Sequence, residues 1–165
     1  MVYFSLGRLY YEWNNLPSAE HALREGIAVG QRTGRGRLWP SSYAALAWIR
    51  WAGGDVTQTA AVMDQALATG RLLNRPSIMA DVEARQAGLW LAQGDPPAAA
   101  RWLAKRAIGV DDQFSYEQQA EYLLLARIRM TQEREAPGTI DLDGVIRLLE
   151  RLLQMAEADQ RMVDR

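Results

Sequence analysis

Residues 43–55 read Tyr43-Ala44-Ala45-Leu46-Ala47-Trp48-Ile49-Arg50-Trp51-Ala52-Gly53-Gly54-Asp55, an apolar stretch of helical periodicity that ends in a Gly-Asp turn. The same pattern returns along the chain at a shift of about 40 residues. The aligned positions are Leu6, Leu46 and Leu125, then Gly7, Ala47, Ala87 and Ala126, then Leu23, Met63 and Leu103, and the turn pairs Gly54-Asp55 and Gly94-Asp95. A period of this length indicates one supersecondary unit used several times.

Each repeat holds two segments of helical periodicity, and no segment alternates as a strand would. All six prolines fall at the breaks between segments, where the first turn of a helix tolerates them. We therefore expect an all-α chain of about eight helices, at residues 2–14, 17–32, 40–53, 56–72, 76–93, 96–107, 116–132 and 141–160. One hairpin cannot bury its apolar face alone, so the hairpins must stack as an α-α superhelix. The sequence predicts four helical hairpins in a single domain over residues 1–165, with repeat units at about 2–35, 40–73, 76–109 and 116–160.

The composition excludes several classes of protein. The 165 residues include no cysteine, which removes disulfides, zinc ribbons and thiol catalysis. One histidine, His21, leaves a Ser–His triad or a His-rich metal site little to work with, and we expect it to face outward or to flank the next repeat as an ordinary surface or packed residue. The net charge of −1 favours neither nucleic acid nor an anionic membrane. We expect a cytoplasmic protein with no metal, no cofactor, no membrane contact and no direct binding of nucleic acid.

The first unit resembles the tetratricopeptide (TPR) signature in Leu6-Gly7, Tyr10, Ala19, Leu23 and Gly26. The period near 40 departs from the 34 residues of a standard TPR. A narrower resemblance covers most of the chain and rests on residues 116–127, 146–153 and 156–158, on the Gly-Asp turns and on Trp102-Leu103 before Asp111-Asp112. These stretches look like the TPR-like superhelical domain of MalT-type, LuxR-family ATP-dependent transcription activators of bacteria.

Members of that family carry a P-loop ATPase before the superhelix and a helix-turn-helix after it. A P-loop needs a Gly-Lys pair, which this sequence lacks, so Gly34-Arg35-Gly36-Arg37 is interpreted as a loop between repeats. The resemblance implies that the chain is a fragment of a larger regulator, its sensing part. The arginines at positions 32, 35 and 37 form the densest basic cluster, which we interpret as a solvated loop.

The resemblance also implies which residues bind. In TPR solenoids the first helix of each hairpin lines the concave face, and the repeat register carries those positions onto this chain. The candidate binding residues are Phe4, Arg8, Tyr11, Glu12, Trp48, Trp51 and Arg127, and the same register includes Ala44 and Ala84. Aromatic rings beside arginines suit a sugar, a nucleotide-like effector or a peptide. The alternative is that Trp48 and Trp51 pack against a neighbouring unit.

Two functions therefore stay open. The first is an effector- or partner-sensing domain of a MalT-like regulator, and the alternative is a TPR scaffold for protein–protein interaction. An enzyme has little support, because Asp111-Asp112 and Glu133-Glu135 are interpreted as solvated acids in turns. Trp13, Trp90 and Trp102 are interpreted as structural. Both ends lack a polar capping helix, which favours a dimer through the terminal repeats.

Overall fold

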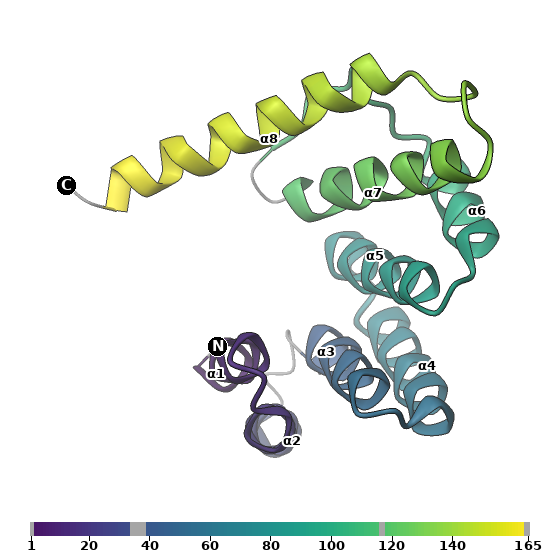
Figure 1. Ribbon diagram of the computed structural model, residues 1–165. Coiled ribbons are helices and arrows are strands. Elements are labelled where there is room, and N and C mark those ends of the chain that lie inside the picture. The colour runs from purple at the N-terminus through teal and green to yellow at the C-terminus, as the bar shows by residue number, and fades with distance from the viewer. Residues whose placement is uncertain (1, 34–38, 116–117, 164–165) are drawn as a thin grey trace. The chain divides into compact units, whose positions relative to one another are not determined.

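The computed structural model describes residues 2–33, 39–115 and 118–163, with side chains through residue 158 (Figure 1). Within these ranges the chain forms eight α-helices and no strand. They are α1 (Val2–Glu12), α2 (Leu16–Thr33), α3 (Trp39–Ala52), α4 (Val56–Leu73), α5 (Pro76–Ala92), α6 (Pro96–Arg106), α7 (Gln119–Glu135) and α8 (Leu142–Val163). The predicted all-α class is confirmed, and every helix begins and ends within three residues of its predicted bounds. The loop at 34–37 and the start of the fourth unit at residue 116 lie outside the described residues.

The Gly-Asp turns act as the sequence predicts. Gly54 and Gly94 have φ angles of 84° and 79°, a left-handed conformation that a glycine adopts without steric cost. The aspartate that follows each glycine caps the next helix, because Asp55 Oδ1 accepts the Gln58 N–H at 3.1 Å and Asp95 Oδ1 accepts the Ala98 N–H at 3.0 Å.

The first hairpin uses the same turn with different residues. Asn14 has a φ angle of 55°, and Asn15 Oδ1 accepts the Ser18 N–H at 3.2 Å. Asparagine tolerates the left-handed region better than other side chains. Asn14-Asn15 is therefore the equivalent of Gly54-Asp55, although the two pairs share no residue.

The chain divides into two compact units, Met1–Gln86 and Ala87–Arg165, at a point inside α5. The prediction of one continuous domain stays a prediction. In the first unit, α1 pairs with α2 and α3 pairs with α4, and α2 also packs against α3. Its core holds small and aliphatic side chains, Ala19, Leu23, Ala45, Leu46 and Ile49.

Glycines let the helices of the first unit approach closely. A Cβ atom on Gly7 would lie 2.7 Å from Leu23 Cγ, so α1 and α2 are in contact at this point, as the small residue predicts. Gly30 of α2 lies against the indole of Trp39, and Gly70 of α4 lies against the Met79 side chain. The second helix of each hairpin thus accepts a large side chain from the start of the next hairpin.

In the second unit, Arg151 of α8 holds the loop that follows α6. α7 packs against α8, and Arg151 donates hydrogen bonds to the carbonyl oxygens of Val110 and Asp112 in the loop after α6. The same guanidinium lies 5.2 Å from the ring centroid of Phe114, which stacks on Tyr122. One arginine therefore fixes a loop that has no regular structure of its own.

Candidate functional site

A cavity of about 240 Å³ opens in the first unit among the first helices of successive hairpins. It is lined by Gly7, Arg8, Tyr11 and Glu12 of α1, Leu23 of α2, Ala45, Trp48 and Ile49 of α3, and Arg85 of α5. Ligand sites in helical proteins commonly lie between helices in this way, with an apolar lining and a few polar groups.

Small residues form part of the apolar wall of the cavity. Gly7 has no side chain and Ala45 has only a methyl group, and both are buried. Leu23 and Ile49 supply the remaining apolar surface, and Leu23 is fixed in the core of the unit. The repeat requires a small residue where α1 meets α2, and this requirement leaves space beside α3.

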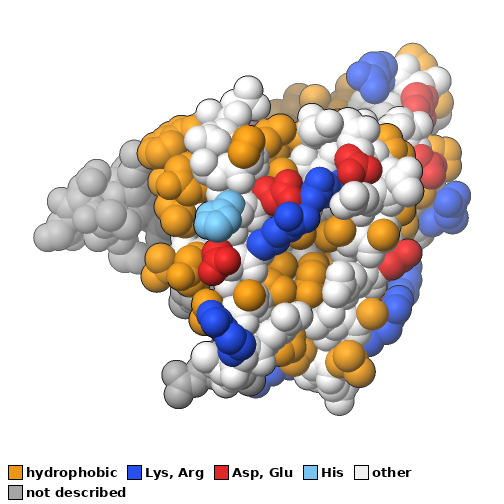
Figure 2. Space-filling view, turned by 90° about the horizontal axis from the view of Figure 1, so that it is seen from below, with side chains coloured by type: hydrophobic (Ala, Val, Ile, Leu, Met, Phe, Trp, Pro, Cys, Tyr) orange, Lys and Arg blue, Asp and Glu red, His pale blue; other side chains and the backbone are white. Residues whose placement is uncertain are grey.

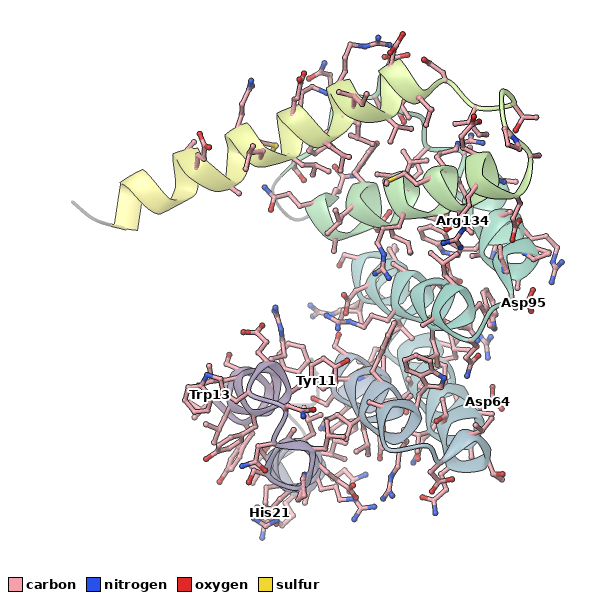
Figure 3. The ribbon with its side chains drawn as sticks, in the orientation of Figure 1. Tyr11, Trp13, His21, Asp64, Asp95 and Arg134 are labelled. Carbon is pink, nitrogen blue, oxygen red and sulfur yellow. The ribbon has the colours of Figure 1, made fainter. Side chains whose placement is uncertain are left out.

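Two aromatic side chains face this space. Tyr11 lies on the side of α1 that faces α3, whereas Trp13 lies on the opposite side of the helix (Figure 3). Trp48 of α3 donates its indole N–H to the Arg85 carbonyl oxygen at 3.2 Å, which fixes the ring. Trp51 packs edge to face on Trp48, with ring centroids 5.9 Å apart. The Trp48 ring is therefore held in place before any ligand binds.

The charged groups of the cavity differ in how firmly they are held. Arg8 and Glu12 form an ion pair at 3.9 Å with side chains that are 60% and 63% exposed, so the pair is weak. Arg85 is fixed more firmly, because its Nε donates to Asp81 Oδ1 at 3.0 Å and its guanidinium lies 5.7 Å from the Phe4 ring centroid. Ser41 in turn donates to Asp81 Oδ2 at 2.6 Å.

The structure brings six of the seven predicted residues into one neighbourhood of the first unit. Arg8, Tyr11, Glu12 and Trp48 line the cavity. Phe4 and Trp51 do not line it, but each contacts a residue that does. Arg127 lies on α7 of the second unit, where its side chain is exposed.

Sequence reasoning missed Arg85 and its partner Asp81. The two lie four residues apart on α5, which is the spacing of a helical ion pair, and this was the available signal. The register also placed Ala44 and Ala84 on the binding face, and this was wrong. Both are buried in the core, because their small side chains allow close packing.

The acids of the second unit have structural roles. Asp112 accepts the Gly109 N–H at 2.7 Å and the Tyr122 hydroxyl at 3.2 Å. Burial, together with the nearby charge of Asp112, raises the pKa of Tyr122. The interpretation of Asp112 as a solvated turn residue was wrong, because its carboxylate organises the loop before α7.

Glu133 does not lie in the turn where the sequence placed it. It lies within the last turn of α7, which continues to Glu135, and its carboxylate accepts the N–H groups of Gly138 at 2.6 Å and Ile140 at 3.1 Å. The hydrogen bond from Gly138 lowers the pKa of Glu133. A cavity of about 420 Å³ beside these loops is lined by three acids, by Arg129 and by four uncharged residues. One of the acids, Asp112, already accepts two hydrogen bonds.

The remaining polar candidates give no further site. His21 is exposed on α2 and lies at the surface among acidic and basic side chains (Figure 2). Within the described part of the chain, no three His, Asp or Glu side chains lie close enough to hold a metal ion. No helix in the same part is long and apolar enough to span a membrane.

The family model for the MalT-like TPR region matches residues 1–165. The chain belongs to the MalT-like TPR region family. Searches of curated proteins and of solved structures found no match. As a MalT-like TPR region, the chain is a TPR-like domain of MalT-type regulators, and the cavity lies on the helices that the repeat register selected.

Proposed function

We propose that this MalT-like TPR region is a non-catalytic sensing domain of a LuxR-family transcription regulator, and that it binds its effector in the cavity among α1, α3 and α5. The observation that supports the proposal is the convergence of Tyr11, Trp48 and Arg8 on one apolar space. A preformed apolar cavity with a few polar groups is the usual form of a small-molecule site.

Occupancy of the cavity would be passed to ATPase and DNA-binding domains of the parent regulator. A ligand in the cavity contacts α1, α3 and α5 at once and therefore stabilises one arrangement of these helices. We further propose a cytoplasmic location and no direct contact of this region with nucleic acid.

A small-molecule thermal-shift screen tests the proposal. A compound that binds the native state raises the midpoint of unfolding. We expect a stabilising compound whose effect is lost in Trp48→Ala and Arg8→Ala and kept in the matched variants Trp13→Ala and Arg71→Gln, which lie outside the cavity lining. A screen without any stabilising compound, or one whose hits ignore Trp48 and Arg8, would contradict the proposal.

A second candidate function, binding of a protein partner, is favoured by a specific feature of α8. Leu142, Ile146 and Leu153 lie on one face of this helix, and the last two are 53% and 60% exposed. Exposed apolar stripes of this kind mark interaction surfaces. The partner would be a protein or a second copy of the chain docked through its terminal repeat.

Sedimentation equilibrium tests the dimer. We expect self-association that weakens at least tenfold in Ile146→Glu, because a charge in an apolar contact is not compensated. The matched control, Glu150→Gln, changes an exposed residue one turn further along α8. A protein that stays monomeric at high concentration would exclude the dimer.

A further inference from the structure

We infer that the effector taken by the cavity of the first unit is a small aromatic monocarboxylate, with its ring between Tyr11 and Trp48 and its carboxylate on Arg8. The inference rests on the proposed function and adds the chemical class of the ligand. It follows from the volume of the cavity, from the groups that face it and from the sign of its charges.

The volume sets the size of the ligand. The cavity measures about 240 Å³, below the roughly 300–1,000 Å³ of sites for drug-sized molecules. A single ring system with a short polar substituent fits this space. A nucleotide or an oligosaccharide would extend out of it.

The walls select a flat apolar body. Trp48 has already committed its indole N–H to the Arg85 carbonyl oxygen, so its ring offers the ligand only an aromatic surface. Leu23, Ala45 and Ile49 add apolar contacts. A monosaccharide of similar size would need hydrogen-bond partners for each of its hydroxyl groups, whereas Arg85 already donates to Asp81, and Arg8 lies beside Glu12. An aromatic ring needs none and gains from stacking.

One cation of the cavity is weakly held and can turn to an anion. Arg8, Glu12 and Arg85 are the charged side chains of the lining, and Arg85 is paired with Asp81. Asp81 holds Arg85 from outside the lining, so Arg85 is fixed in position. Arg8 is bound to Glu12 only at 3.9 Å, and its guanidinium can turn to a ligand. A guanidinium binds a single carboxylate with two parallel hydrogen bonds.

Calorimetric titration with phenylacetate and its neutral isostere phenylacetamide tests the class. We expect phenylacetate to bind with one site per chain and phenylacetamide to bind at least about tenfold more weakly, since a charged hydrogen bond is lost. Arg8→Gln should weaken phenylacetate about tenfold and leave phenylacetamide unchanged. Tyr11→Ala should weaken both, and the exposed control Arg71→Gln should weaken neither.

The outcomes separate this inference from the function on which it rests. Equal affinity for acid and amide, or an Arg8→Gln variant that keeps the preference for the acid, would overturn the ligand class. Glucose that stabilises the wild type but not Trp48→Ala would overturn the class and leave the sensing function in place. Failure of phenylacetate to bind, together with a thermal-shift screen without hits, would overturn both.

Discussion

At the scale of single residues, Gly7 connects the repeat to the cavity. Its missing side chain lets α1 pack onto Leu23, and both residues line the cavity. The equivalent positions in the later repeats carry alanine, at Ala47, Ala87 and Ala126. The two helices of the first hairpin therefore lie closer together at this point than an alanine would allow without a shift of Leu23.

Gly7→Ala should lower the free energy of unfolding by about 1–2 kcal/mol, because overpacking outweighs the gain in helix propensity. The added Cβ would lie 2.7 Å from Leu23 Cγ and 3.3 Å from the Ala19 carbonyl oxygen, and both neighbours are buried. Urea unfolding measures the change. The control is Gly53→Ala, whose added Cβ meets nothing nearer than 3.5 Å. Equal stability of the two variants would show that α1 moves freely away from α2.

Ionisation of Tyr122 makes the free energy of unfolding depend on pH in the alkaline range. Its pKa is raised above the ordinary value of 10.0, first by burial and then by Asp112. The folded chain therefore holds this proton more tightly than the unfolded chain. The contribution is fully present below pH 10 and is lost as the pH rises through the folded-state pKa.

The expected result is a free energy of unfolding that falls above pH 10 in the wild type and falls less steeply in Tyr122→Phe. Urea unfolding between pH 8 and pH 11, at about half-unit steps, measures both slopes. The control Tyr3→Phe removes an exposed phenol from the other unit and should keep the wild-type slope. Identical slopes for the wild type and Tyr122→Phe would contradict the account.

At the scale of elements, the turn between the two helices has the same conformation and the same kind of N-cap in three hairpins. Asn15, Asp55 and Asp95 each accept the N–H of the residue three positions later, and each follows a residue with positive φ. The fourth hairpin differs. Asp141 caps α8 through the Gly144 N–H at 2.9 Å, after a longer loop that Glu133 organises.

Asp95→Ala should cost about 1 kcal/mol of stability, which is typical for the loss of an N-cap. Asp64→Ala is the matched control, since Asp64 lies exposed within α4 and Asp95 lies just before α6 (Figure 3). The control should change the free energy of unfolding by less than about 0.5 kcal/mol. Thermal or urea unfolding decides between them. Equal losses would mean that charge, rather than the cap, carries the effect.

At the scale of the whole molecule, the sequence predicted the helices and turns that recur in the repeats, and it missed the contacts that occur at one place only. Periodicity and the Gly-Asp turns predicted eight helices, because these depend on neighbours within a few residues. Arg85 lines the cavity because α5 packs beside α3. No spacing in the sequence indicates this contact. Arg50, at a position where the TPR signature has an aromatic residue, pairs with Glu20 at 2.5 Å from another hairpin.

The candidate site was predictable to the same extent. The register selected the faces of α1 and α3 and so named Arg8, Tyr11 and Trp48, which line the cavity. It did not predict which part of those faces is filled by neighbours and which part stays open. Packing volumes across three helices decide that, and they are a property of the fold.

Chemical-shift mapping tests the central claim, that the cavity of the first unit is the effector site. The labelled protein is titrated with the most stabilising compound of the screen, and the amide signals are compared. We predict that the largest changes occur at Gly7, Arg8, Tyr11 and the Trp48 indole N–H. Changes confined to α7 or α8, with the Trp48 signal unmoved, would contradict the claim.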